Sequence, residues 1–307
     1  MDRKRLIHVV FGSTSDEEKV LLGLVRATKE FGVDVQVDYA SADNTPEKVE
    51  SIADLHNSHA CNTMRGSAVF ISGAGLSNVL TGVLKSVSGA YDLNIGIPIS
   101  DSSSDGLTSL LSTSEKPPRN PVLTVGMNNS YAAVSIANRF MDGLGHVSVW
   151  EDPVIRRMVG EDSFAGLKKA FDSYDMLYPA KTLEEISPDD VVVKIFTPNH
   201  YGLWIADELV SKGKGVVVGV SGMPIKDYCP RTYAQTQFPA YKPLSDRTMT
   251  ATGIVSSRGY DNAVMMAAIL TRDYAVIDKI AKTRKEKADL LRKHKGLLIS
   301  NGEVTKL

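Results

Sequence analysis

Short apolar runs that alternate with helix-forming segments are the feature that most constrains this chain. Runs rich in apolar and β-branched residues occupy positions 5–11, 33–39, 67–72, 94–99 and 121–127. Each is followed by a segment with helical periodicity or a helix start signal, such as Thr45-Pro46 before "EKVESIADL". Strands separated by helices predict a parallel sheet that is covered by helices on both faces. We therefore expect an α/β chain with three layers.

The second half of the chain repeats part of this pattern. Strand-like runs lie at 146–150, 191–196, 215–222 and 249–257, and helical segments lie at 162–174, 201–213 and 259–270. Tyr131 and Tyr260 stand 260 − 131 = 129 residues apart, and each opens a helix of small residues. This self-similarity predicts two tandem related domains, 1–143 and 144–307, each flavodoxin-like or Rossmann-like. The second is a degenerate copy that adds a long loop at 221–247 and a basic C-terminal helix at 274–295.

Charge and composition exclude several classes of function. The net charge of −1 gives no electrostatic reason to expect nucleic acid as a partner. No apolar run reaches the ~18 residues that span a bilayer, and the first residues lead straight into a strand without a signal-peptide pattern. Cys61 and Cys229 lie far apart and form no metal-ligand pattern. Such cysteine usage suits a reducing cytosol, so we expect a cytoplasmic protein without a metal, a cofactor or a membrane partner.

A glycine turn rich in hydroxyl groups follows the first run. Gly12 ends the apolar segment, and Ser13, Ser15 and Asp16 follow before a charged helical pattern begins. Glycine lets the backbone approach a ligand, and serine hydroxyls can bind an oxyanion. The alternative is that Ser15 is a helix N-cap and that Glu18 completes a capping box.

Three further segments are expected to lie at the same edge of the predicted sheet as this turn. They are "YASADNTPEKV" (39–49), "ISGAGLSNVLTGVL" (71–84) and "ISDSSSDGLTSLLSTSEKPPRNP" (99–121), and each follows a predicted strand. The carboxyl ends of parallel strands meet at one edge of a sheet, where ligands bind. We therefore expect the four segments to form one site.

Together, in this order, the four segments resemble the aminoimidazole ribonucleotide carboxylase family of purine synthesis, which includes the carboxyaminoimidazole ribonucleotide mutases. The resemblance covers about residues 5 to 142 and is closer to the branch that uses CO2 directly. It implies a ribonucleotide bound across these loops, with Ser13, Ser15 and Asp16 near its phosphate and ribose. The implied substrate-binding residues are Gly12, Ser13, Ser15, Asp16, Ser41, Ala42, Asn44, Ala74, Gly75, Ser77 and Asn78.

The sequence departs from the family pattern where the chemistry is expected. Asp43 stands in the place of the family's proton-transfer histidine. Asn44 replaces a basic residue that helps to hold the phosphate, and Leu76 replaces an arginine of the CO2-using branch. A histidine, with an ordinary pKa of ~6.5, suits removal of the ring proton, whereas an aspartate starts near ~3.9 and needs burial or a neighbouring carboxylate. Two interpretations remain open. Asp43 is a catalytic residue on one, and on the other it is part of an ordinary "ADNTP" turn without a catalytic role.

The second half supplies one competing catalytic candidate. His200 follows the run at 191–196, and it either brings the missing proton-transfer group or lies at the surface as part of a helix start. Lys226, Arg231 and Lys242 of the long loop are candidates for the missing phosphate charges.

Two classes of function remain. The first is a carboxylase or mutase that uses an aminoimidazole ribonucleotide, or a similar ribonucleotide, with CO2 or bicarbonate. The second is a ribonucleotide-binding or regulatory protein without the chemistry. Because the family assembles into octamers, the resemblance implies a homo-oligomer, and two fused copies predict a tetramer of chains.

Overall fold

The first half of the chain folds into five strands that all run in the same direction. In the computed structural model they are β1 (Leu6–Phe11), β2 (Asp34–Tyr39), β3 (Val69–Ala74), β4 (Leu93–Pro98) and β5 (Leu123–Thr124). Their order in the sheet is β2-β1-β3-β4-β5, and every neighbouring pair is parallel. β3 and β4 are buried along their whole length, whereas β2 is partly exposed because it lies at the edge. The predicted parallel sheet is confirmed.

The structure describes residues 6–58, 67–100, 106–117, 119–196, 215–221, 252–255, 260–293, 297–300 and 303–306.

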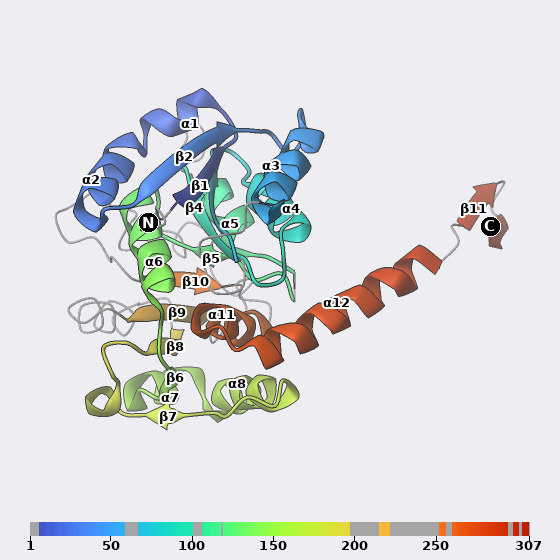
Figure 1. Cartoon of the computed structure of the whole chain (residues 1–307). Helices are drawn as coiled ribbons and strands as arrows, with labels where there is room; N and C mark the ends of the chain where they lie inside the picture. Colours follow the sequence, from blue (N-terminus) through green and yellow to red (C-terminus); the bar gives the residue numbers. More distant parts are fainter. Residues whose placement is uncertain are drawn as a thin grey trace.

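Helices cover both faces of this first part of the sheet. They are α1 (Thr14–Glu18), α2 (Leu21–Phe31), α3 (Pro46–Ser58), α4 (Val79–Val87), α5 (Leu107–Ser114) and α6 (Ser130–Asp142). Successive side chains of a strand point to opposite faces, so Val9 joins the cluster that contains Leu24 of α2. Val10 joins the separate cluster that contains Val49 of α3 and Leu80 of α4. The chain therefore has the three layers that the pattern predicts (Figure 1).

The second half repeats the strand order of the first. Its strands are β6 (Val147–Trp150), β7 (Ala180–Lys181), β8 (Val191–Phe196), β9 (Val216–Ser221) and β10 (Thr252–Val255). Counted from the far edge, their order is β7-β6-β8-β9-β10, the same second-first-third-fourth-fifth order as in the first half. The described helices of this half are α7 (Pro153–Val159), α8 (Glu161–Ser173), α11 (Asp261–Thr271) and α12 (Tyr274–Lys293), with a 3-10 turn at Leu183–Glu185. A shared strand order is what a tandem duplication predicts, whereas the division at residue 143 stays a prediction.

The two halves form one continuous sheet of ten strands. They meet where β5 and β10 pair in the antiparallel direction, with Thr124 opposite Ile254. Hydrogen bonds also cross the boundary: Arg272 donates to the Phe140 carbonyl at 2.6 Å, and the Asn120 backbone N–H donates to Asn262 Oδ1 at 3.2 Å. Because this central pairing is antiparallel, the strands of the two halves end at opposite edges of the sheet. We call these the first-half edge and the second-half edge.

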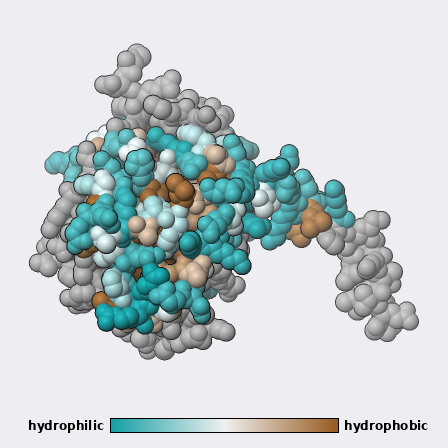
Figure 2. All heavy atoms as spheres, turned by 90° about the horizontal axis from the view of Figure 1, so that it is seen from below, coloured by the Kyte–Doolittle hydropathy of each residue, from teal (hydrophilic) through white to brown (hydrophobic). Residues whose placement is uncertain are grey.

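The last helix leaves the body of the molecule. Ile277 and Ile280, in the first part of α12, are buried, and the helix then extends outward to the small hairpin of β11 (Leu297–Ser300) and β12 (Glu303–Lys306) (Figure 1). Figure 2 shows apolar atoms near the far end of this arm, where Leu290 and Leu291 are exposed. Within the described part of the chain, no helix has the length and apolar character needed to cross a bilayer.

Candidate functional site

The four segments singled out in the sequence meet at the first-half edge. β2, β1, β3 and β4 are neighbours in the sheet and run in parallel, so their carboxyl ends, where the four segments follow, lie next to one another. This edge is the usual ligand site of open parallel sheets. The prediction that the segments share one edge is confirmed.

Gly12 is required by the close approach of two turns. Its backbone N–H donates to the Gly73 carbonyl at 3.0 Å. A Cβ atom at this position would lie 3.1 Å from Ala74 Cβ and 3.3 Å from Asp16 Oδ2, which is tighter than most such contacts. A larger residue would therefore push the first turn away from the third.

Asp16 joins these two turns through its carboxylate. Its Oδ1 atom accepts a hydrogen bond from the Gly75 backbone N–H at 3.1 Å, and its Oδ2 atom accepts one from the Ser13 hydroxyl at 2.9 Å. Ser13 and Ser15 lie 2.8 Å apart, Oγ to Oγ, and both are exposed. Asp16 itself is only 6% exposed. The carboxylate therefore holds the turns together, and the two serines remain open to a ligand.

The capping-box alternative for Ser15 is wrong. Helix α1 begins at Thr14, so that Ser13 is the N-cap and Ser15 lies inside the helix. The Ser13 side chain makes no capping bond, because its hydroxyl is directed at Asp16. The hydroxyl groups of Ser13 and Ser15 therefore belong to the turn and do not cap the helix.

The second turn is held by Ser41. Its hydroxyl oxygen accepts from the backbone N–H groups of Asp43 at 3.3 Å and Asn44 at 3.2 Å, and from the Asn44 side-chain amide at 3.2 Å. The Ser41 N–H in turn donates to the Thr45 hydroxyl at 2.9 Å. This is the turn geometry that serine favours. It leaves Asp43 and Asn44 exposed at the first-half edge and Ala42 partly buried.

The third turn contains a buried amide. Asn78 caps helix α4: its Oδ1 atom accepts from the Thr81 N–H at 3.4 Å and from the Thr81 hydroxyl at 2.7 Å, while its Nδ2 group donates to the Ile97 carbonyl at 3.3 Å. Because this side chain is fully buried and bonded, it shapes the loop rather than facing solvent. Leu76 has a φ of 49°, and its side chain is exposed.

Two lysines near this edge were not singled out in the sequence. The Lys19 ammonium donates to the Ser100 carbonyl, and the Lys116 ammonium donates to the carbonyls of Asn78 at 3.2 Å and Ser112 at 2.5 Å. Burial lowers the pKa of Lys116 to about 8. Lys19 and Ser100 are 81 positions apart in the chain, and Lys116 and Asn78 are 38 positions apart, so no local spacing pattern predicts these two contacts.

His200 and the cations at 226, 231 and 242 lie outside the described residues.

The second half fills the place of the glycine turn with bulky and charged residues. At the end of β6, the Lys194 ammonium lies 3.0 Å from the centre of the Trp150 ring and 3.3 Å from Asp152 Oδ2. Asp152 also caps α7, because its Oδ1 atom accepts from the Val154 N–H at 2.8 Å. Lys194 is fully buried.

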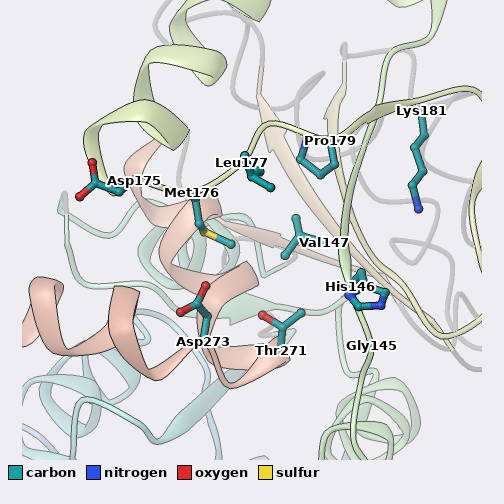
Figure 3. A pocket seen from close by; sticks show the side chains of 10 residues that line it. All are labelled: Gly145, His146, Val147, Asp175, Met176, Leu177, Pro179, Lys181, Thr271 and Asp273. Atoms are coloured by element: carbon teal, nitrogen blue, oxygen red, sulfur yellow. The ribbon is translucent and has the colours of Figure 1, made fainter.

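A hollow of about 650 Å³ lies at the start of β6, away from all the predicted site residues. Figure 3 shows Val147, Met176 and Leu177 around it, with Asp175 and Lys181 toward its two ends. Both of these charged residues already have partners, since Asp175 pairs with Lys279 at 2.6 Å and Lys181 with Asp190 at 2.8 Å. This hollow therefore does not extend the candidate site.

Comparison with known proteins points to one family. The family model described as AIR carboxylase matches residues 6–152. The N5-carboxyaminoimidazole ribonucleotide mutase of Methanocaldococcus jannaschii is 40% identical over 132 residues, which cover 43% of this chain and 76% of that protein. The enzyme of the same name from Pyrococcus horikoshii is 34% identical, over 45% of this chain and 73% of that protein.

A longer relative covers more of this chain. The phosphoribosylaminoimidazole carboxylase of Candida albicans is 30% identical over 185 residues, which are 60% of this chain and 29% of that protein.

Proposed function

Because this chain belongs to the AIR carboxylase family, we propose that it is a carboxylase or mutase of the purine-biosynthesis type that acts on an aminoimidazole ribonucleotide. The observation that carries the proposal is the hydrogen bond from the Gly75 N–H to Asp16. This bond couples the first and third turns, and the turn at Ser41 lies beside them on the neighbouring strand. A turn with open hydroxyl groups, flanked by two further turns at the ligand edge of a parallel sheet, suits a phosphorylated sugar with an attached ring.

The proposed ligand lies across these turns. The exposed hydroxyls of Ser13 and Ser15 hydrogen-bond the phosphate and the ribose, and the turns at Ser41 and Gly75 flank the ring. In the carboxylation, the ring carbon forms a bond to the carbon of CO2, and the proton on that ring carbon passes to a base. Bicarbonate is the second possible carbon source. No cofactor is required by this scheme.

Asp43 is the proposed base, because it lies at this edge and stands in the place of the family's proton-transfer histidine. Asp43→Asn is expected to abolish turnover while ribonucleotide affinity stays nearly unchanged, since a group that acts in the transition state lowers the rate without a uniform loss of binding. The measurement is CO2-dependent conversion of aminoimidazole ribonucleotide together with calorimetric binding. His200→Asn in the same assay tests the competing donor from the second half of the chain.

Normal turnover by Asp43→Asn would remove Asp43 from the chemistry. No CO2-dependent conversion by the unmodified protein between acid and neutral pH would exclude the carboxylation of this substrate.

A second candidate function is a ribonucleotide-binding or regulatory protein. It is favoured by the self-contained turn at Ser41, in which exposed Asp43 and Asn44 stand where the family pattern has a histidine and a basic residue. A carboxylase of a different ribonucleotide fits the same observation. Mass spectrometry of small molecules that co-purify with the chain separates these alternatives.

We also propose the wider organisation that the sequence predicts. Residues 1–143 form the ribonucleotide-binding unit, and residues 144–307 form a second copy that has lost this site. The chain works in the cytoplasm as a homo-oligomer, with four chains in the assembly.

A further inference from the structure

We propose that Lys19 binds the phosphate group of the ligand at the first-half edge and so makes the site selective for a ribonucleotide over its unphosphorylated riboside. This inference rests on the proposed function and names the residue that would recognise the charged end of that substrate.

The need for such a residue follows from the charge of the loops at this edge. Among the described residues of the segments 12–19, 40–46, 74–79, 99–100 and 125–131, the one cation is Lys19. The same residues include four carboxylates: Asp16, Glu17, Glu18 and Asp43. A phosphate monoester carries a charge of about −1.5 to −2 at neutral pH. Among these residues, Lys19 is the one positive charge that can offset the repulsion between the carboxylates and a phosphate.

The geometry places the Lys19 side chain across the edge. Lys19 is the C-cap of helix α1, which follows β1 in the chain. Its ammonium donates to the carbonyl of Ser100, which follows β4. β3 lies between β1 and β4, so that the side chain spans the end of a whole strand. Lys19 is exposed, and an ammonium has three N–H donors, so the bond to Ser100 leaves donors for a ligand.

The acceptor of this bond is itself fixed. The Ser100 N–H donates to Asn128 Oδ1 at 3.0 Å, and its hydroxyl accepts from the Asn128 amide at 2.8 Å. Asn128 has a φ of 55°, a left-handed conformation that asparagine tolerates better than most residues. Ser100 therefore holds the ammonium in place before a ligand arrives, which lowers the ordering cost of binding.

Two of the nearby carboxylates are already engaged. Asp16 accepts from Gly75 and Ser13, as described above, and Glu17 accepts a hydrogen bond from the Tyr39 hydroxyl. The bond to Glu17 raises the pKa of Tyr39, so the phenol stays a donor to that carboxylate. Lys19 has no carboxylate partner among the ion pairs of the described residues, and its charge is available to a phosphate.

The test compares two ligands and three variants of the full chain. Binding of aminoimidazole ribonucleotide and of its riboside is measured by calorimetry for Lys19→Met, Lys19→Arg and Lys29→Met. Lys29→Met is the matched control, because Lys29 is exposed on α2, away from the edge loops. Lys19→Met should bind the ribonucleotide about 10- to 100-fold more weakly, the loss expected for one charge-assisted hydrogen bond. Its riboside affinity should stay within about twofold.

The conservative variant and the control separate recognition from folding. Lys19→Arg keeps the charge and should retain most of the ribonucleotide affinity, and Lys29→Met should match the unmodified protein. Equal losses for ribonucleotide and riboside in Lys19→Met would indicate a merely structural role and overturn the proposal. So would an unchanged ribonucleotide affinity, and in both cases the proposed function would survive. If the unmodified chain binds neither compound, the proposed function fails and the role of Lys19 fails with it.

Discussion

Asp16 shows how one buried carboxylate can organise a site. Its two oxygens accept hydrogen bonds from two different turns, and removal of the side chain would leave the Gly75 N–H without its acceptor. We expect Asp16→Ala to lower the free energy of unfolding by about 1–3 kcal/mol, the cost of an unsatisfied buried group. Asp16→Asn keeps an acceptor for Gly75 and should cost less.

The control for this prediction is Ser15→Ala. Its hydroxyl is exposed, and the substitution should change stability by no more than about 0.5 kcal/mol. Urea unfolding of the three variants measures the series. An Asp16→Ala protein as stable as Ser15→Ala would show that the bond to Gly75 contributes nothing.

At the same residue scale, sequence reasoning located the turns but not their contacts. The Gly12 to Asp16 pattern correctly predicted a tight turn at a ligand edge, because glycine and short polar residues are local signals. The hydrogen bond between Asp16 and Gly75 is a tertiary contact between residues 59 positions apart, and no local sequence pattern predicts it. The same holds for Lys19, whose role depends on a carbonyl 81 positions away.

At the scale of elements, long apolar runs were predictable and short elements were not. All the strands of four or more residues in the two halves coincide with apolar runs, but β7 has two residues and no run to mark it. Helix α7 was missed although Asp152-Pro153 is a typical start signal, an N-cap followed by proline at the first helical position. The hairpin β11–β12 lies beyond the last helix and was also missed.

β8 carries a charge in the middle of a buried strand. Burial lowers the pKa of Lys194 to about 8, whereas an unfolded lysine titrates near about 10.5. Between these values the unfolded chain holds a proton that the folded chain has released, so the free energy of unfolding rises with pH in this window. Relative to Lys194→Met, the unmodified protein should gain up to about 3 kcal/mol between pH 8 and 10.5.

Chemical unfolding across this pH range checks the prediction. Lys168→Met is the control, because Lys168 is exposed on the neighbouring helix α8 and should leave the pH slope unchanged. Parallel pH profiles for the unmodified protein and Lys194→Met would show that the buried ammonium titrates normally.

At the scale of the whole molecule, the shared strand order of the two halves fits the repeat that the sequence predicts, whereas the way in which the halves join was not predicted. The two halves have similar patterns of apolar runs and the same strand order. They join at a seam, the antiparallel pairing of β5 with β10, in which Thr124 lies opposite Ile254. The small-residue helices α6 and α11 are buried within the chain, α11 along almost its whole length. Their buried faces are therefore not available for contacts between chains, and the exposed Leu290 and Leu291 of α12 are the proposed contact instead.

We expect light scattering to give the mass of four chains. Leu290→Asp combined with Leu291→Asp should shift the protein to a smaller species, because the exposed apolar end of the arm is the proposed contact and a charge there opposes burial. Leu177→Asp, at an exposed leucine on the loop after α8, should leave the mass unchanged. A monomeric unmodified protein would contradict the proposed assembly.

The seam between β5 and β10 also affects how the chain folds. It brings together residues that are 254 − 124 = 130 positions apart, a contact that closes a very large loop. Contacts of such long range are slow to form, whereas the strands on either side of the seam find their neighbours over shorter distances. Each half can therefore build its own sheet first, and until the halves join, β5 and β10 are open strand edges that another chain can pair with. The step that completes the sheet is thus the one most exposed to misassembly during synthesis.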